Sequence, residues 1–375
     1  QPFAPGAARL AASRLPAAGE SQTLLTVEKA GRFALAAKSA TGVALQLVDM
    51  IAGPGEIAGE AGQRDGRLDV LLDVGIYKLK AFGAMDGKGE AALSVAAFSE
   101  LEGQGGELDP GHSAPLGDLQ QRSYWVSVGK DGRVSVEAVG RALQDLRLWR
   151  NGRDMADLTP DTGIVEPKTG KPMTRLRLEG QVEPGAWRVT AYGGAPAVWT
   201  DGDMATPFHI RGGEPLPLAA GVAEGVLGPF GAVRYRAPAE ADHFRLELPE
   251  VAPADLSARR DGAVSRASIG KSNREPATSV GVPRGKDDKP AIVEISGREG
   301  QPYRLQALAK ADGLRIEGAG PHLVSVALSS ASGDEAPATA VLARTDGKAR
   351  VLASDVVRLG PAQAWPPRFN LRRAP

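Results

Sequence analysis

The sequence predicts an all-β protein of three tandem antiparallel β-sandwich domains, of the jelly-roll or immunoglobulin-like type, followed by the start of a fourth. Three observations indicate this fold class. Apolar and polar residues alternate with period two in many short segments, as in half-buried strands. Gly and Pro, 47 and 28 of the 375 residues, interrupt these segments often. One set of strand patterns recurs at a spacing of about 100 residues, which is the length of a domain.

The clearest repeated segment is a strand that begins just after a glycine turn. Residues 75–83 read Gly-Ile-Tyr-Lys-Leu-Lys-Ala-Phe-Gly, and residues 185–193 read Gly-Ala-Trp-Arg-Val-Thr-Ala-Tyr-Gly. A third copy, with one inserted residue, starts at Gly300. The alternation assigns one aromatic residue per copy to the core, at the same place in three superimposable domains: Tyr77, Trp187 and Tyr303. The next residue in each copy is basic and is assigned to the solvent side: Lys78, Arg188 and Arg304.

Two upstream segments repeat in the same order. Residues 29–33, Lys-Ala-Gly-Arg-Phe, match residues 130–134, Lys-Asp-Gly-Arg-Val. The strand-like residues 43–48 match residues 144–149. Because three segments keep one order at spacings of roughly 100 residues, the repeat is interpreted as a domain duplication.

The repeats and the turn-rich stretches between them set the predicted boundaries. Sandwich repeats are expected over residues 1–105, 106–213 and 214–330. Residues 331–375 are either a partial fourth repeat or a tail ordered by a partner, because so short a β unit buries too little apolar surface to be stable alone.

Several of these segments resemble the bacterial pre-peptidase C-terminal (PPC) domain. The resemblance rests on Pro215-Leu216-Pro217-Leu218, on Leu146-Arg147-Leu148-Trp149 and on Pro184-Gly185-Ala186-Trp187-Arg188-Val189. It implies small jelly-roll-like sandwiches in secreted proteins, beside enzymes or surface proteins. Family members near collagenases can bind calcium through clustered Asp residues, but no unit start here has a matching cluster, so that property is not transferred.

Composition excludes several classes of protein. The 45 basic and 45 acidic residues cancel, which argues against a nucleic-acid partner. The absence of Cys excludes disulfide scaffolds and thiolate chemistry. No apolar run is long enough for a transmembrane segment. The chain starts at Gln1 without a methionine, which favours a mature end left by a signal peptide. We therefore expect an extracytoplasmic protein, in the periplasm, on the outer surface or secreted.

The sequence contains no motif for catalysis, a metal or a cofactor. The four histidines, His112, His209, His243 and His322, are too far apart for a zinc motif. Asp201-Gly202-Asp203 offers two carboxylates, which is fewer than the six to eight oxygens of a calcium site. We expect no catalytic residues, no metal and no cofactor, and hence a protein that is not an enzyme.

One aromatic residue is assigned to the outside of its strand. Leu146 and Leu148 point inward, so Trp149 lies with Arg147 on the outer face, beside Arg150. An exposed Trp between arginines is typical of a protein contact or a sugar-stacking site. In the alternative interpretation, Trp149 packs on a neighbouring domain.

These observations predict a non-catalytic bacterial protein acting as a structural, adhesion or envelope-scaffold module. Its expected partners are proteins of a larger assembly or the remainder of a longer chain. One alternative is the accessory, PPC-like region of a secreted peptidase or other hydrolase. The other is a carbohydrate-binding module with a polysaccharide as its partner.

Overall fold

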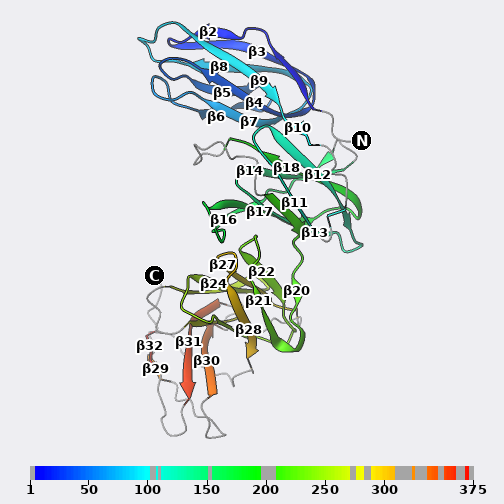
Figure 1. Cartoon of the computed structure of the whole chain (residues 1–375), viewed down its shortest axis with the longest axis vertical. Coiled ribbons are helices and arrows are strands. Elements are labelled where there is room, and N and C mark those ends of the chain that lie inside the picture. The colour runs from blue at the N-terminus through cyan, green and yellow to red at the C-terminus, as the bar shows by residue number, and fades with distance from the viewer. Residues whose placement is uncertain are drawn as a thin grey trace. The chain divides into compact units, whose positions relative to one another are not determined.

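The structure is a computed structural model of the whole chain (Figure 1). It describes residues 5–101, 107–108, 111–150, 154–195, 208–270, 276–282 and 289–308, together with the backbone of four further strands between residues 323 and 370. The chain divides into two compact units, residues 1–163 with 174–212 and residues 164–173 with 213–375. The predicted all-β class with antiparallel sandwiches is confirmed, because strands pair into sheets throughout the described residues.

The first sandwich has a five-stranded and a four-stranded sheet. The larger sheet has the order β1 (Ala7–Leu10), β3 (Glu20–Lys29), β8 (Gly75–Phe82), β5 (Ala44–Asp49) and β6 (Gly53–Ala58). The smaller has the order β2 (Arg14–Pro16), β9 (Glu90–Ala97), β4 (Gly31–Lys38) and β7 (Arg67–Leu72).

The second sandwich has two five-stranded sheets. One has the order β10 (Ser99–Glu100), β12 (Gln120–Val128), β18 (Gly185–Gly193), β14 (Leu143–Arg150) and β15 (Asp154–Met155). The other has the order β11 (His112–Ala114), β19 (Phe208–Gly212), β13 (Arg133–Gly140), β17 (Met173–Gln181) and β16 (Asp161–Val165).

The third sandwich lies in the second unit. Its larger sheet has the order β20 (Leu216–Pro217), β22 (Ala232–Arg236), β27 (Ile292–Gly297), β24 (Ala254–Arg260) and β25 (Ala263–Ile269). Its smaller sheet has the order β21 (Val222–Val226), β28 (Pro302–Leu308), β23 (His243–Glu247) and β26 (Ala277–Gly281), and one 3-10 turn spans Ala219–Gly221.

The sheet that holds the first strand has the same strand order in all three sandwiches, whereas the opposite sheet has four strands in the first and third and five in the second. When the strands of each sandwich are counted in chain order, the sheet that holds the first strand places it beside the third. The third pairs with the penultimate strand, which is followed by the fifth and the sixth. The edge strand differs, because β1 pairs antiparallel with β3, whereas β10 and β20 pair parallel with β12 and β22. The repeat is therefore one basic topology, with a further strand in the second sandwich and a different edge pairing in the first.

The register of the central strand shows which residues are equivalent. Leu79 on β8 pairs with Thr23 and Leu47, and Val189 on β18 pairs with Tyr124 and Leu148. Tyr77 and Trp187, each two residues earlier, occupy equivalent positions and are 8 % and 6 % exposed.

The predicted equivalence of Tyr303 to these two residues is wrong. In the third sandwich the central strand is β27, where Val293 pairs with Tyr235 and Ala258. The position that matches Tyr77 and Trp187 is therefore Ala291. Tyr303 is buried, but it lies on β28 in the opposite sheet, where its hydroxyl is 2.6 Å from that of Tyr235.

A glycine closes the repeated strand in all three sandwiches, four residues after Leu79, Val189 and Val293. At Gly83 and Gly193 a Cβ atom would lie 1.8 Å and 2.1 Å from the carbonyl oxygens of Ala17 and Gly117. The third glycine is Gly297, next to the Gln301 side chain. The pattern aliphatic-x-aliphatic-x-Gly over residues 293–297 was thus the sequence signal for the third copy.

Each sandwich encloses its own apolar core. The largest fully buried side chains are aromatic and aliphatic residues of facing strands, among them Phe33, Tyr124, Phe208 and Phe244. The basic residues predicted on the solvent side lie on outer faces, where Arg304 forms an ion pair with Glu224 at 3.1 Å.

The tail strands pair across the predicted boundary at residue 330. β29 (Leu323–Ser325) pairs with β32 (Arg368–Asn370), and β30 (Ala336–Arg344) forms a hairpin with β31 (Arg350–Leu359). The β31 backbone lies beside β26 and β25 of the third sandwich.

The hydroxyl pair in the third core can be tested by a double-mutant cycle. We expect Tyr303→Phe to lower the free energy of unfolding by about 1–3 kcal/mol, because the buried Tyr235 hydroxyl loses its partner. Adding Tyr235→Phe should restore part of that loss, since no buried hydroxyl then remains unpaired. Denaturant unfolding of the four proteins measures the coupling. Additive losses would contradict the assigned hydrogen bond.

Candidate functional site

The two sandwiches of the first unit meet through the outer faces of two sheets (Figure 1). On one side are the outward residues of β4 and β7, and on the other are those of β14 and β18. The residues between these faces, which we call the joint, form a cluster of polar and aromatic side chains to which both sandwiches contribute.

A buried ion pair forms the centre of the joint. The Arg32 guanidinium donates to Asp145 Oδ2 at 2.5 Å, and both side chains are at most 10 % exposed. Arg147 donates to the same oxygen from Nε at 3.0 Å, while Asp145 Oδ1 accepts the backbone N–H of Leu146 at 2.9 Å. The carboxylate therefore receives hydrogen bonds from two arginines and one amide, which compensates for the loss of its hydration.

Aromatic rings surround the same guanidinium. Arg32 Cζ lies 5.5 Å from the ring centre of Phe98 and 5.0 Å from that of Tyr192. The two rings meet edge to face, with centres 6.1 Å apart. Burial raises the pKa of the Tyr192 hydroxyl, so this side chain stays neutral. Cation–π contact of this kind is strongest where water is excluded.

An apolar cluster completes the contact. Ala34, Phe98 and Tyr192 are buried together, and Leu71, Leu119 and Trp149 pack against them. Because Ala34 and Leu71 come from the first sandwich and Tyr192, Leu119 and Trp149 from the second, this small core belongs to the joint rather than to either sandwich.

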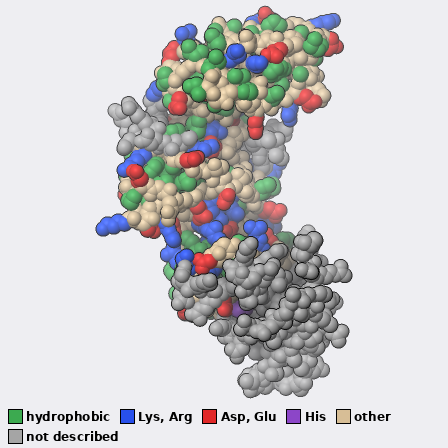
Figure 2. Space-filling model, turned by 180° about the vertical axis from the view of Figure 1, so that it is seen from behind, with side chains coloured by type: hydrophobic (Ala, Val, Ile, Leu, Met, Phe, Trp, Pro, Cys, Tyr) green, Lys and Arg blue, Asp and Glu red, His purple; other side chains and the backbone are tan. Residues whose placement is uncertain are grey.

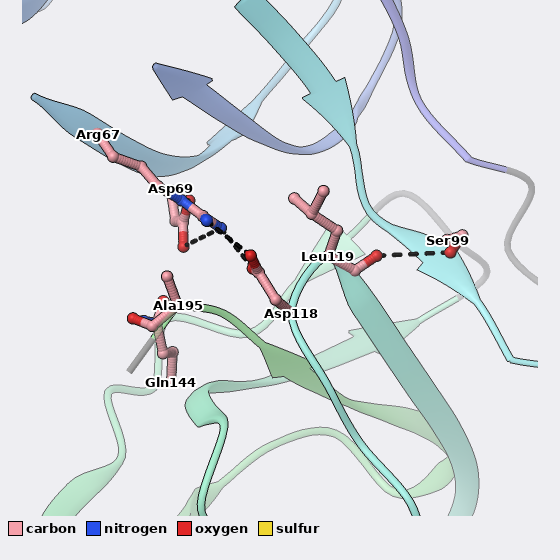
Figure 3. Close-up of polar contacts among 7 residues, drawn as sticks. All are labelled: Arg67, Asp69, Ser99, Asp118, Leu119, Gln144 and Ala195. Carbon is pink, nitrogen blue, oxygen red and sulfur yellow. Dashed lines mark hydrogen bonds and ion pairs between the residues drawn. The ribbon is translucent and has the colours of Figure 1, made fainter. Parts of the chain in front are cut away.

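A second ion-pair group lies at another part of the joint (Figure 3). Arg67 of β7 donates to both carboxylate oxygens of Asp118, at 2.7 Å and 2.6 Å, and to Asp69 beside it at 2.9 Å. The two carboxylates raise the pKa of the Arg67 guanidinium, and the hydrogen bonds that Arg67 donates to Asp118 contribute most. A bidentate ion pair of this geometry fixes the relative orientation of the two side chains as well as their distance.

The connection between the sandwiches is itself part of a sheet. The Ser99 N–H donates to the Leu119 carbonyl at 2.9 Å, and the Leu101 N–H donates to the Gln121 carbonyl at 3.0 Å. The Ser99 hydroxyl also contacts the Leu119 carbonyl, at 3.4 Å (Figure 3). The Glu100 carboxylate accepts the N–H and the hydroxyl of Ser123. The chain thus enters the second sandwich with few free backbone torsions.

The structure separates the three residues predicted to form a binding site. Trp149 and Arg147 lie on the outer face of β14, as their alternation indicates, but Trp149 packs into the joint and Arg147 bonds Asp145. Arg150 points the other way. It forms an ion pair with Glu183 and lies 5.7 Å from the ring centre of Trp187.

Arg150 and Trp187 border a separate open groove of about 380 Å³. The indole N–H of Trp187 donates to the Glu183 carbonyl at 2.8 Å, and the ring is 6 % exposed. With its face covered by Arg150, this indole has little surface for a ligand.

Sequence reasoning missed a cross-strand row of aromatic and basic side chains beside the joint. Trp125 and Trp149 are both opposite Arg188, on the two sides of β18. Arg188 lies 5.4 Å from the Trp125 ring, and Trp125 is 42 % exposed. The missed signal is Trp125 in the alternating segment 120–128.

A charged cluster lies on the outer face of the opposite sheet of the second sandwich. Glu137, 3 % exposed, is 2.8 Å from both Arg177 and Arg211 and 3.9 Å from Arg175. Burial alone would raise the pKa of Glu137, but the arginines outweigh it and hold the pKa below its ordinary value.

The described histidines are engaged singly. His112 stacks on Tyr124, His209 contacts the Ser113 hydroxyl at 2.6 Å, and His243 contacts Asp242 at 2.5 Å. Within the described ranges, no group of three or more His, Asp or Glu side chains could hold a metal. His322 and Asp201-Gly202-Asp203 lie outside those ranges.

Charges of both signs are interspersed on the face of the first unit in Figure 2, with no continuous basic patch among the coloured side chains. In the described part of the chain, no helix has the length and apolar character to cross a bilayer.

Comparison with known proteins identifies no family. No family model matches the chain, and no curated protein matches it. Among solved structures, one similar chain is described as a "putative secreted protein" from Eubacterium rectale. The two are 9 % identical, the match covers 56 % of this chain and 80 % of the other, and the TM-score is 0.25. A similarity at this level carries no functional assignment.

The central ion pair gives a stability prediction. We expect Asp145→Ala to lower the free energy of unfolding by about 3–5 kcal/mol, because it leaves the Arg32 guanidinium buried and unpaired. The double variant Arg32→Met with Asp145→Ala should be less destabilised, since it removes the charge as well.

Glu183→Ala is the matched control, because it breaks the ion pair with Arg150 at a carboxylate that is 79 % exposed. Its cost should be below about 1 kcal/mol. Equal losses for Asp145→Ala and Glu183→Ala in denaturant unfolding would contradict the buried pair.

Glu137 predicts an acid-sensitive contribution to stability. Because its folded pKa is below the ordinary value of 4.5, its contribution is complete above that value and is lost as pH falls through the folded pKa. Glu137→Gln should therefore be destabilising near pH 6, and its deficit relative to the wild type should shrink as pH falls below 4.5. Unfolding near pH 6 and below pH 4.5 measures this, with Glu90→Gln at an exposed carboxylate as control. A deficit independent of pH would refute it.

Proposed function

We propose that the chain is a non-catalytic structural module of an extracytoplasmic bacterial protein, in which paired sandwiches hold attached partners at a fixed orientation. The partners are proteins of a larger assembly or further parts of a longer chain. The resemblance to PPC domains, and with it the accessory region of a secreted hydrolase, stays a proposal of the same kind, since a rigid spacer would serve both.

The joint is the observation that carries the proposal. Two flexibly linked domains usually meet in a polar, sparsely packed contact and move relative to each other. Here a buried Arg–Asp pair, a bidentate Arg–Asp pair and an aromatic cluster span the contact. The buried pair is costly unless it is complete, so partial opening of the joint is disfavoured.

The short connection supports the same conclusion. β9 ends at Ala97 and β10 begins at Ser99, already paired with β12. A single residue, the buried Phe98, separates the two strands. A linker of this length gives the second sandwich little orientational freedom before any side-chain contact forms.

Distances between two spin labels, measured by electron paramagnetic resonance, can test this rigidity. Because the chain has no cysteine, two introduced cysteines can be labelled without side reactions. Labels at Glu90→Cys in the first sandwich and Arg133→Cys in the second occupy exposed positions. We expect one narrow distance distribution, as for two points on one body.

The joint variant Arg67→Ala with Asp145→Ala should broaden that distribution at least twofold. Arg150→Ala with Glu183→Ala, which removes an ion pair elsewhere in the second sandwich, should leave it narrow. Circular dichroism verifies that both variants are folded, and Asp118→Asn is the milder substitute. A broad distribution in the wild type would reject the scaffold proposal.

A further inference from the structure

We propose that a polar pocket at the joint binds a neutral sugar ring. The pocket has a volume of about 390 Å³ and is open to solvent on one side. Arg32, Asp69 and Leu71 of the first sandwich line it, together with Gln144, Asp145 and Arg147 of the second. This volume lies within the range of small-molecule sites and accommodates one hexose with several waters.

The charges lining the pocket favour an uncharged ligand. Two arginines and two aspartates face it, so their formal charges cancel. An anion would meet Asp69 and Asp145, and a cation would meet Arg32 and Arg147. A polyhydroxylated ring instead donates to carboxylates and accepts from guanidinium groups, and leaves the existing ion pairs intact.

Arg147 carries unused hydrogen-bonding capacity into the same site. Arg32 Nε also has no acceptor among the described residues, but this atom is buried from solvent and is not assigned to the site. Arg147 uses only its Nε on Asp145 at 3.0 Å in the described structure, and its guanidinium is 26 % exposed.

The site also offers an apolar contact for the ring. Leu71 lines the pocket and packs against the aromatic cluster of the joint. A pyranose has a face of C–H groups and a rim of hydroxyls, so one face can lie on Leu71 while the rim meets the charged groups. Asp69 and Gln144, which come from opposite sandwiches, lie near one another in Figure 3.

Because both sandwiches supply lining residues, a bound ring would bridge the joint. This inference is independent of the scaffold proposal, since a joint can be rigid without a ligand. Spin-distance measurements test rigidity and binding measurements test the pocket, so either can fail alone.

The test uses the full chain, titrated with glucose, galactose, mannose and N-acetylglucosamine and followed by calorimetry and backbone amide shifts. We expect at least one of these neutral sugars to bind with millimolar affinity and to shift the amides of Leu71, Gln144 and Arg147. Glucuronic acid and glucosamine, which are charged, should bind at least tenfold more weakly than that sugar.

Arg147→Ala should weaken binding tenfold or more. Arg150→Ala is the matched control, because it is on the same strand but borders the other groove. Gln144→Ala is a second pocket variant should Arg147→Ala not fold. The proposal is overturned if no neutral sugar binds at tens of millimolar, if a charged sugar binds better, or if binding survives Arg147→Ala or Gln144→Ala in a folded protein.

Discussion

Arg32 and Asp145 are 113 residues apart in the sequence, but their side chains are 2.5 Å apart in the structure and at most 10 % exposed. Both charges are stable there only because each has further support. Asp145 accepts from Arg147 and from a backbone amide, and Arg32 lies against two aromatic rings. Removing Arg32 or Asp145 alone leaves the other charge buried without its partner, which destabilises the folded protein. In the proposed scaffold, this requirement is what would hold the first two sandwiches at one orientation.

The joint combines three kinds of interaction, and each restricts the two sandwiches in a different way. The apolar cluster of Ala34, Phe98 and Tyr192 gives area-dependent stabilisation without direction. The bidentate bond from Arg67 to Asp118 adds direction at a half-exposed position, where the pair contributes less energy but fixes the angle. The β10 strand restricts the backbone path. We expect all of these contacts to form together in only one relative orientation of the two sandwiches. Other residues of the joint border the polar pocket that we propose as a sugar-binding site.

Sequence patterns predicted the local structure well, but of the joint they predicted only one contact, in the alternative interpretation that Trp149 packs on a neighbouring domain. Period-two alternation placed Tyr77, Trp187 and Trp149 on the correct sides of their strands, because a strand alternates regardless of its neighbours. The third repeat was misaligned by one strand because an aromatic residue after a glycine was weighted above the closing Gly297. The partners of Arg32 and Arg67 could not be found, since nothing local links residues of different domains. The sequence did contain one sign of the joint. Asp145 and Trp149 both lie on the outer face of β14, and an outward Trp indicates that another part of the protein covers that face.

Nuclear spin relaxation of the intact chain tests the central claim most directly. If the joint holds the two sandwiches as one body, backbone amides of residues 7–97 and of residues 112–193 will report one rotational correlation time and one set of diffusion axes. That shared time will be longer than a sandwich of about 100 residues would show alone. Two distinct and shorter correlation times, one for each sandwich, would contradict the account.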